Sequence, residues 1–367
     1  MRFQISRDAL LRPVQQVLGV VEKRQTLPVL ANLLLDLEEG RLSIVGSDLE
    51  VEMMASMSAI DGESGVTTVP SKKLADICRS LPDDSVLDIH LDGDRLVVKS
   101  GRSRFTLSTL PADDFPVAEV VEDGELLELP QSVLRRLIDS THFCMAHQDV
   151  RFFLNGLLLE VGDRVLRAVA TDGHRMALSE EKIDFSSDEL RQVIVPRKGV
   201  IELMRLLEHT DEKIAVRLGS KQIQIELPGY RFTSKLIDGR FPNYERVLPV
   251  VGEHSVVADR VQLRGALNRA SILSNEKYRG VRVELTENWL GLTAHNPEQE
   301  IAEEELEVEY VGDPLQIGFN VSYLQDALNS GNTEKCVLWM KDSDSSCLIV
   351  DEEEDRVSKY VIMPMRL

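Results

Sequence analysis

The sequence predicts an α+β protein built from three copies of one domain, each with two helices packed on antiparallel strands. Three observations support this prediction: groups of residues recur at a nearly constant spacing, the recurring helices share one apolar face, and short alternating runs lie between them. The chain of 367 residues is also much longer than a typical domain of about 100–150 residues, so we expect several hydrophobic cores.

The clearest repeat is a helical segment led by a proline or an asparagine. Its copies are TVPSKKLADICRSL from Thr68, IVPRKGVIELMRLL from Ile194 and, less closely, GFNVSYLQDALNSG from Gly318. This alignment makes Pro70, Pro196 and Asn320 equivalent, with spacings of 126 and 124 residues.

Two other sets of residues support the same repeat. Residues 46–48, 170–172 and 294–296 recur at a spacing of 124, and FTLSTLPADDFP from Phe105 matches FTSKLIDGRFP from Phe232. Because all three sets keep the same order at nearly the same spacing, chance is a poor explanation.

Apolar residues of the repeated helix fall at i, i+3, i+4 and i+7, which is one face of an α-helix. They are Leu74, Ile77, Cys78 and Leu81 in the first copy, Val200, Leu203, Met204 and Leu207 in the second, and Leu324, Ala327 and Leu328 in the third. Pro70 and Pro196 precede their helices, where a missing amide hydrogen costs nothing, and Asn320 can cap the third helix.

Each copy also opens with a helical stretch. The apolar positions that mark these stretches are Leu10, Val14, Val17, Leu18 and Val21, then Leu134, Leu137 and Ile138, then Leu263, Leu267 and Ala270. Between the helices lie strand-like runs such as SVLDIHLDGDRLVVKS and KIAVRLGSKQIQIEL, with hairpin turns at 92–93 and 218–220. We therefore predict domains at residues 1–122, 123–252 and 253–367.

The composition, with 43% hydrophobic and 28% charged residues, is that of an ordinary globular protein, and the apolar runs are too short to span a membrane. The amino terminus lacks the apolar core and cleavage site of a signal peptide, so we expect the protein in the cytoplasm. The four cysteines, Cys78, Cys144, Cys336 and Cys347, have no metal-ligand spacing, which predicts reduced structural thiols.

The net charge of −20 argues against nucleic acid unless the charges are separated along the chain. The six helical segments carry a summed charge of +8, which leaves −28 on the remaining residues. If the helices line one surface, that surface is basic and can bind phosphates without sequence preference. The alternative interpretation is that Lys and Arg are simply good helix formers that face water.

Asp172 and His174 lie close together and could suggest acid–base chemistry, but their counterparts in the other copies lack the histidine. A turn in which Asp172 bonds its own backbone is the preferred interpretation. No nucleotide-binding, nucleophile or metalloprotease motif appears, so we predict no enzyme, no cofactor and no metal. The apolar tail 360–367 is interpreted as a binding surface, a final strand, or both.

The motifs TDGHR, VIVPRKGVIELMR, FTSKLIDGRFPNYERVLP, SNEKYRGVR, IGFNVSYL and VIMPMRL resemble the bacterial β sliding clamp family, the β subunit of DNA polymerase III, over the whole chain. The resemblance implies a processivity factor: a head-to-tail homodimer of three-domain chains that forms a six-domain ring around duplex DNA. It also implies opening by a clamp loader and binding of DNA polymerases and repair proteins through short linear motifs.

The resemblance also implies three groups of site residues. The peptide-binding pocket would comprise Leu154, Thr171, Gly173, His174, Arg175, Met176, Pro242, Arg246, Val247, Asn320, Tyr323, Ser346, Val361, Met363, Pro364, Met365 and Arg366. DNA contacts would come from Arg24, Lys72, Gln148, Arg197, Lys198, Tyr278 and Arg279. The dimer interface would pair Lys73, Arg102, Arg104, Phe105 and Leu107 with Ile272, Leu273, Glu298, Glu300 and Glu304.

Two positions depart from the family pattern. Met176 stands where the family usually has leucine, a change that conserves volume and should leave the pocket open. Phe152 and Phe153 stand where the family often has tyrosine, so stacking or packing replaces a hydroxyl contact to DNA. The competing hypotheses are a protein-interaction scaffold that never touches DNA and a hydrolase that uses Asp172 and His174.

Overall fold

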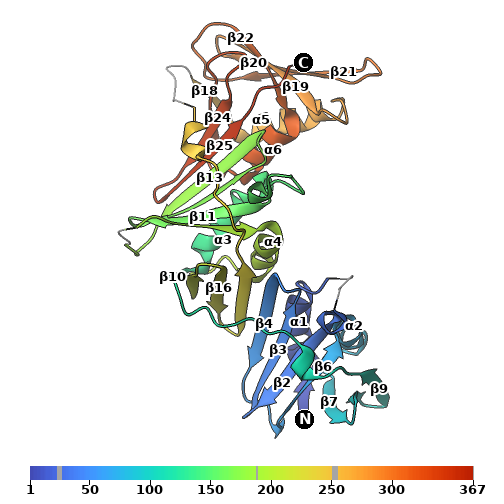
Figure 1. The fold of residues 1–367 in the computed structure, drawn as a ribbon. Coiled ribbons are helices and arrows are strands. Elements are labelled where there is room, and N and C mark those ends of the chain that lie inside the picture. The colour runs from blue at the N-terminus through green and yellow to red at the C-terminus, as the bar shows by residue number, and fades with distance from the viewer. Residues whose placement is uncertain (23–26, 187–188, 250–254, 367) are drawn as a thin grey trace. The chain divides into compact units, whose positions relative to one another are not determined.

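The computed structural model describes residues 1–22, 27–186, 189–249 and 255–366, and the predicted DNA contact Arg24 lies outside them. The described residues form two compact units, one of Met1–Ser132 with Lys198–Leu236 and one of Val133–Arg197 with Ile237–Leu367. Each unit holds two antiparallel sheets, which agrees with the predicted α+β class (Figure 1).

Six α-helices occur in the described part of the chain, two in each predicted copy. Their bounds are α1 Arg7–Leu18, α2 Ser71–Ser80, α3 Gln131–Asp139, α4 Arg197–Leu206, α5 Arg260–Ser271 and α6 Val321–Ser330. Helix α1 packs beside α2, and α5 packs beside α6. The prediction of two helices per copy is therefore confirmed.

The first unit contains a five-stranded and an eight-stranded sheet. The five-stranded sheet has the order β5 (Gly62–Glu63), β1 (Arg2–Ser6), β7 (Val86–Asp92), β8 (Arg95–Ser100) and β9 (Ser103–Ser108). The eight-stranded sheet has the order β10 (Glu125–Pro130), β15 (Lys213–Leu218), β16 (Gln222–Leu227), β17 (Tyr230–Lys235), β4 (Val51–Met57), β3 (Arg41–Ser47), β2 (Asn32–Glu38) and β6 (Gly65–Pro70).

The second unit contains an eight-stranded and a four-stranded sheet. The eight-stranded sheet has the order β14 (Arg191–Pro196), β11 (Gly156–Gly162), β12 (Val165–Thr171), β13 (Arg175–Lys182), β25 (Arg356–Ile362), β24 (Cys347–Glu352), β23 (Lys335–Trp339) and β18 (Ser255–Asp259). The four-stranded sheet has the order β21 (Ile301–Glu307), β20 (Trp289–His295), β19 (Gly280–Thr286) and β22 (Leu315–Asn320).

Each copy contributes two halves of four strands to these sheets, and the first copy adds the short strand β5 at one edge. One half ends in β9, β17 or β25, and the other half ends in β4, β13 or β21. Strand β4 of the first copy pairs with β17 of the second, and β13 of the second pairs with β25 of the third. Consecutive copies are thus joined by backbone ladders, while the predicted boundaries at residues 122 and 252 stay a prediction.

The core of the first copy explains why a small residue recurs at position 46, 170 and 294. A Cβ atom on Gly46 of β3 would lie 2.7 Å from Cγ1 of Val17, because α1 packs closely against this strand. Val14 and Val17 are fully buried there. Only glycine fits this approach, and the other copies have alanine at the equivalent positions.

The helix termini follow the expected caps with one difference. Asn320 accepts a hydrogen bond from the Ser322 amide at 2.9 Å, as predicted for the N-cap of α6. Helix α1 ends at Leu18, before the apolar pattern ends at Val21, and the amides of residues 19–21 bond the carbonyls three residues earlier, as in a 3-10 turn. Val20 lies after the end of the helix but is fully buried, so its side chain packs in the core.

All four cysteines are free and buried. Burial raises the pKa of the Cys78 and Cys336 thiols to about 11 and raises those of Cys144 and Cys347 further. They therefore pack as apolar side chains, which agrees with the predicted reduced thiols.

Candidate functional site

The junction of β13 and β25 brings the C-terminal tail beside the predicted pocket residues of the second copy. In this antiparallel ladder Arg175 pairs with Ile362 and Met176 pairs with Val361. One residue further on, the Met363 amide donates to the His174 carbonyl at 3.0 Å. Segments almost two hundred residues apart in sequence therefore form one site within the second unit.

Residues 171–175 form a tight turn between β12 and β13, as the sequence predicts. The Thr171 hydroxyl donates to the Arg175 carbonyl at 2.7 Å and accepts from the Gly173 amide at 3.1 Å. Asp172 Oδ1 accepts from the amides of His174 and Arg175 at 2.9 and 3.0 Å, and Gly173 has φ of 89°. Asp172 is thus a structural acceptor, and His174 is exposed at the tip of the turn.

The Arg175 guanidinium fixes this turn to helix α6. It donates to Asp326 Oδ2 at 2.5 Å, to Asp172 Oδ2 at 3.0 Å and to the Phe143 carbonyl at 2.7 Å. It also lies over the Tyr323 ring, 4.4 Å from the ring centroid. Arg175 and Tyr323 therefore hold the wall of the site in place, and no local sequence pattern predicts Asp326 as the partner of Arg175.

We expect Arg175→Ala to lower the free energy of unfolding by about 2–3 kcal/mol, because Asp172 and Asp326 would lose a largely buried cation. Urea titration of the second unit's transition would measure this change. Arg164→Ala is the matched control, since Arg164 and Asp184 form an exposed pair worth less than about 1 kcal/mol. Equal losses for both variants would contradict the assignment.

An apolar cluster forms the floor beneath the turn and the tail. Among the predicted residues it includes Met176 and Val361, both buried, with Val247 packed against it. Residues that the sequence analysis missed complete this cluster: Leu158, Val169, Leu178, Ile194, Phe241, Tyr244 and Leu348. The FPNY run at 241–244 could have indicated two of them, because two large aromatic residues flank a Pro-Asn pair there.

Tyr244 anchors the segment that carries Pro242, Arg246 and Val247. Its ring lies in the apolar cluster, while its hydroxyl donates to Glu160 Oε1 at 2.9 Å and accepts from Arg167 Nη1 at 2.9 Å. Burial raises the pKa of Tyr244 to about 12, so the hydroxyl stays protonated. The 3-10 helix Tyr244–Arg246 is thereby fixed, with Pro242 and Arg246 exposed beside the cluster.

The tail residues divide between two surroundings. Met363 is 38% exposed next to His174, which suits contact with an apolar ligand. Ser346 lies just before Cys347, which pairs with Ile362 in the ladder between β24 and β25. The Met365 amide instead donates to the Gly318 carbonyl at 2.8 Å. Met365 and Arg366 line a cavity of about 370 Å³ together with Asn275, Tyr278, Gly280 and 295–297.

The remaining predicted pocket residues are also placed in the second unit. Leu154 is buried in the 3-10 helix Phe152–Leu154, and its carbonyl accepts from the Ala146 amide at 3.0 Å. Asn320 has its side chain engaged by the cap of α6 and by the Tyr278 carbonyl at 3.4 Å. Pro364 is half-buried between Met363 and Met365.

Three family models match the chain one after another. The DNA polymerase III beta subunit N-terminal domain matches residues 1–119, its central domain matches 128–243, and its C-terminal domain matches 245–366. The chain belongs to the DNA polymerase III beta subunit family.

Relatives agree with this membership over full length. The chain is 54% identical over 368 residues to the beta sliding clamp of Pseudomonas aeruginosa and 50% identical over 368 residues to that of Escherichia coli K12, with both chains covered entirely. A crystal structure of the Pseudomonas aeruginosa sliding clamp bound to griselimycin matches with a TM-score of 0.96 at 54% identity. The Caulobacter crescentus polymerase III beta structure matches with a TM-score of 0.92 at 38% identity, and all four comparisons cover 100% of each chain.

The chain therefore has the three-domain clamp fold and is a processivity factor for DNA replication without catalytic activity. The turn geometry at Asp172 agrees with this conclusion, since its carboxylate is occupied by backbone amides. Within the described residues, no helix has the length and apolar character needed to cross a membrane.

The candidate DNA contacts of the described residues lie on helices and on loops, and they differ in exposure. Lys72 on α2 is exposed, as is Gln148, and Tyr278 is 57% exposed with the Lys277 ammonium 5.2 Å from its ring centroid. Arg197 donates to the Met145 carbonyl at 3.0 Å, and Arg279 is half-buried with φ of 53°.

Lys198, a predicted DNA contact, forms ion pairs within the first unit. Its ammonium donates to Glu22 Oε1 at 2.8 Å and to the Val20 carbonyl at 3.1 Å, and it forms a short ion pair with the buried Asp48 carboxylate. Two carboxylates thus compensate its charge within the first unit. Lys198 holds the 46–51 turn in place and has little charge left for a phosphate.

Phe152 and Phe153 separate into two roles. Phe152 is 56% exposed, whereas Phe153 packs against the apolar cluster of the second unit, and their ring centroids lie 5.8 Å apart. Phe152 is therefore the one available for stacking, and Phe153 is a packing residue.

The predicted interface residues lie on or near two sheet edges. In the first unit, β9 pairs only with β8 among the described strands, and it carries Arg104, Phe105 and Leu107. In the second unit, β21 pairs only with β20 and carries Glu304. Leu107 is buried inside its own copy, whereas Arg104 is exposed and Phe105 half-buried.

The other interface candidates are accessible, with one exception. Ile272 is 75% exposed at the end of α5, Leu273 is half-buried, and Lys73, Arg102, Glu298 and Glu300 are exposed. Glu304 is already bound by Arg269 of the same chain, at 2.8 and 2.6 Å, which lowers the pKa of this carboxylate. A basic residue of a second copy would have to share it.

Proposed function

We propose that two copies of this chain join head to tail into a six-domain ring that encircles duplex DNA. We also propose that the β13–β25 junction binds short peptides from the clamp loader, DNA polymerases and repair proteins. Membership in the clamp family supports the first proposal. The observation that carries the second is the exposed Met363 side chain beside the apolar cluster and the fixed Arg175 turn.

The peptide site suits a short apolar motif rather than a rigid protein surface. Its floor is apolar, its rim offers the polar groups of His174 and Arg246, and Met363 can adapt its shape. A relative of 54% identity holds griselimycin, which supports a ligand site in this fold. The pocket residues predicted from the sequence are proposed as the contact surface, with Leu154, Asn320 and Tyr323 supporting it.

Ring closure follows from the repeated sheet halves. Strand β9 has the same place in its half as β17 and β25, and β21 has the same place as β4 and β13. Since β4 pairs with β17 and β13 with β25, we propose that β21 of one copy pairs with β9 of another. Arg102 and Arg104 would then face the acidic β21, which carries Glu303 and Glu305.

DNA contact is proposed for a small set of basic and polar side chains: Lys72, Gln148, Arg197, Lys198, Tyr278 and Arg279, with Arg24 outside the described residues. Such contacts go to phosphates and carry no sequence information. The net charge of −20 keeps the attraction weak, so a ring can slide. Retention on DNA would then come from linkage rather than affinity.

Retention on circular DNA tests the ring. Protein loaded onto a closed circle by a clamp loader should stay bound in high salt, because a topological link does not depend on phosphate contacts. Cutting the circle once should release it. Gel filtration of the DNA before and after cutting measures this, with uncut circle as the control. Equal release from both forms would refute the ring and favour a scaffold that never encloses DNA.

We further propose that the chain acts in the cytoplasm, where a bacterial chromosome is replicated. The four buried, free cysteines fit a reducing compartment.

A further inference from the structure

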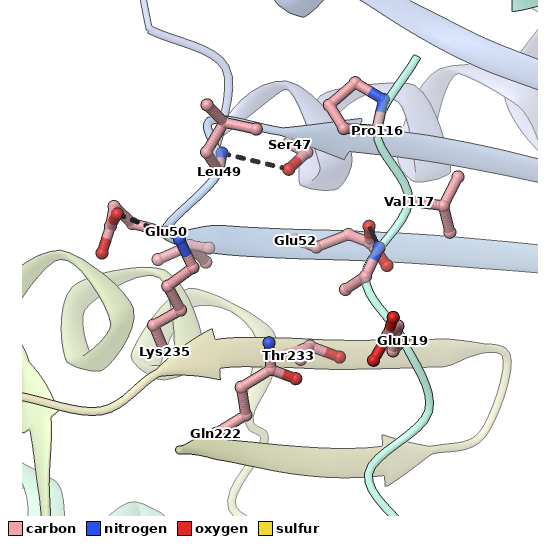
Figure 2. A pocket seen from close by; sticks show the side chains of 12 residues that line it. Ser47, Leu49, Glu50, Glu52, Pro116, Val117, Glu119, Gln222, Thr233 and Lys235 are labelled. Atoms are coloured by element: carbon pink, nitrogen blue, oxygen red, sulfur yellow. Dashed lines mark hydrogen bonds and ion pairs between the residues drawn. The ribbon is translucent and has the colours of Figure 1, made fainter. Parts of the chain in front are cut away.

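A polar cavity of about 260 Å³ lies within the first unit, where β4 meets β17. Figure 2 shows its walls: residues from the end of β3 to the start of β4, the connecting segment 116–119, and strands β16 and β17. Three of its lining side chains are the carboxylates Glu50, Glu52 and Glu119.

This cavity occupies the same place in the repeat as the proposed peptide site. With the offset of 124 residues, Glu50 and Glu52 correspond to His174 and Met176. The ladders agree, because Glu52 pairs with Thr233 as Met176 pairs with Val361.

The same register extends the correspondence to the neighbouring walls. Lys235 follows Ser234 as Met363 follows Ile362, and Pro116 matches Pro242 in the FP repeat. The fold therefore builds the same kind of cleft at both junctions between consecutive copies.

The chemistry of the two clefts differs. Where the peptide site has Met176, Val361 and Met363, this cavity has Glu52, Thr233 and Lys235. An apolar motif would meet the Glu52 carboxylate and the Lys235 ammonium where the peptide site offers methionine side chains. A phosphate would meet carboxylates, which makes a nucleic acid an unsuitable ligand.

The side chain of Glu52 indicates that this cavity binds a ligand. Its side chain belongs to a residue only 3% exposed, and Oε2 accepts from the Ala118 amide at 2.6 Å. Its second oxygen, Oε1, is buried and has no hydrogen-bond partner within the described residues. A buried carboxylate oxygen without a donor is costly, and a bound N–H group would remove that cost.

The other charged groups around Glu52 leave this oxygen unpaired. The Lys235 ammonium lies 3.4 Å from Glu50 Oε1, so it is directed to that carboxylate. Arg231 acts on Glu52 through space, yet burial dominates and raises the pKa of Glu52. Glu119 adds a further negative charge to the lining.

We propose that this cavity is a second contact site that takes one basic side chain, an arginine in preference to a lysine, from an extended segment of a partner protein. A guanidinium is weakly hydrated and offers several donors in one plane, so it can bond Glu52 Oε1 and a neighbouring carboxylate together. Leu49 and Val117 are exposed at the cavity and can cover the methylene stem. None of the residues of the proposed peptide site takes part.

The test uses blocked pentapeptides with one central residue between alanines: arginine, lysine or citrulline, which is neutral and nearly isosteric with arginine. The full-length protein is titrated while NMR follows the methyl groups of Leu49, Val51 and Val117. The arginine peptide should shift them saturably, and the citrulline peptide should bind about tenfold or more weakly. Binding of citrulline as tight as arginine would overturn the proposal.

Two variants define the acceptor. Glu52→Gln keeps the shape and an acceptor for the Ala118 amide, so it should fold with an unchanged or higher Tm but lose the preference for arginine over citrulline. Glu38→Gln, at an exposed position at the end of β2, should bind like the parent. Unchanged arginine binding in Glu52→Gln, or shifts at Val247 and Val361 instead, would place the peptide elsewhere and refute this site.

Discussion

Deletion of residues 363–367 is expected to abolish binding of client peptides while the protein stays folded and dimeric. The β13–β25 ladder ends at the pair of Arg175 and Ile362, so the sheet does not depend on the deleted residues. Met363 would be lost from the side of the cleft where it lies next to His174. Fluorescence anisotropy of a labelled polymerase peptide should show a loss of at least about a hundredfold, the range of an anchor residue.

The matched control for this deletion is Leu190→Ala, which removes an exposed apolar side chain of the second unit outside the proposed peptide site. Its peptide affinity should change far less than that of the deletion. If the deleted protein still binds the peptide, the site has been assigned to the wrong surface. Sedimentation checks that the deleted protein remains a dimer.

Replacing both Ile272 and Leu273 with aspartate is expected to convert the dimer to monomers and to abolish retention on circular DNA. Ile272 is 75% exposed at the end of α5, which is costly for a large apolar side chain unless a second copy covers it. Two aspartates there would increase the negative charge next to the acidic strand β21. Burying their carboxylates in the interface would also cost desolvation free energy. Sedimentation velocity measures the oligomer.

Val261→Asp is the control for the interface, because Val261 is also exposed on α5 but lies at its other end. This variant should remain dimeric. A dimer that persists in the double variant would contradict the proposed edge pairing of β9 and β21. Circular dichroism of each variant confirms that the α-helices are intact.

The repeat made most of the fold predictable. Helix α2 could be located because Leu74 and Cys78 fall on one buried face, and the same pattern placed α4 and α6. The end of α1 was misjudged, because Val21 continues the apolar spacing after the helix has ended at Leu18, and Val20 beside it is buried in the core. An apolar pattern reports burial, and burial can continue after a helix has ended.

The site was less predictable, because its partners come from distant parts of the chain. The Asp172 turn could be inferred from residues two and three positions away. In contrast, Arg175 bonds Asp326, and Lys198 bonds Asp48, each about 150 residues distant. A basic residue in a sequence does not reveal whether a carboxylate already binds it, so the ion pair of Lys198 with Asp48 was not predicted.

The burial of every cysteine has a practical consequence for labelling. The thiolate is the nucleophile that attacks a maleimide, and in this chain burial keeps the Cys78 and Cys336 thiols protonated and those of Cys144 and Cys347 still more so. A fluorophore carried by a maleimide will therefore react with a cysteine introduced at an exposed position in preference to the native ones. A donor dye on β9 and an acceptor dye on β21 would report ring opening as a loss of energy transfer between them. No native cysteine would have to be replaced for this experiment.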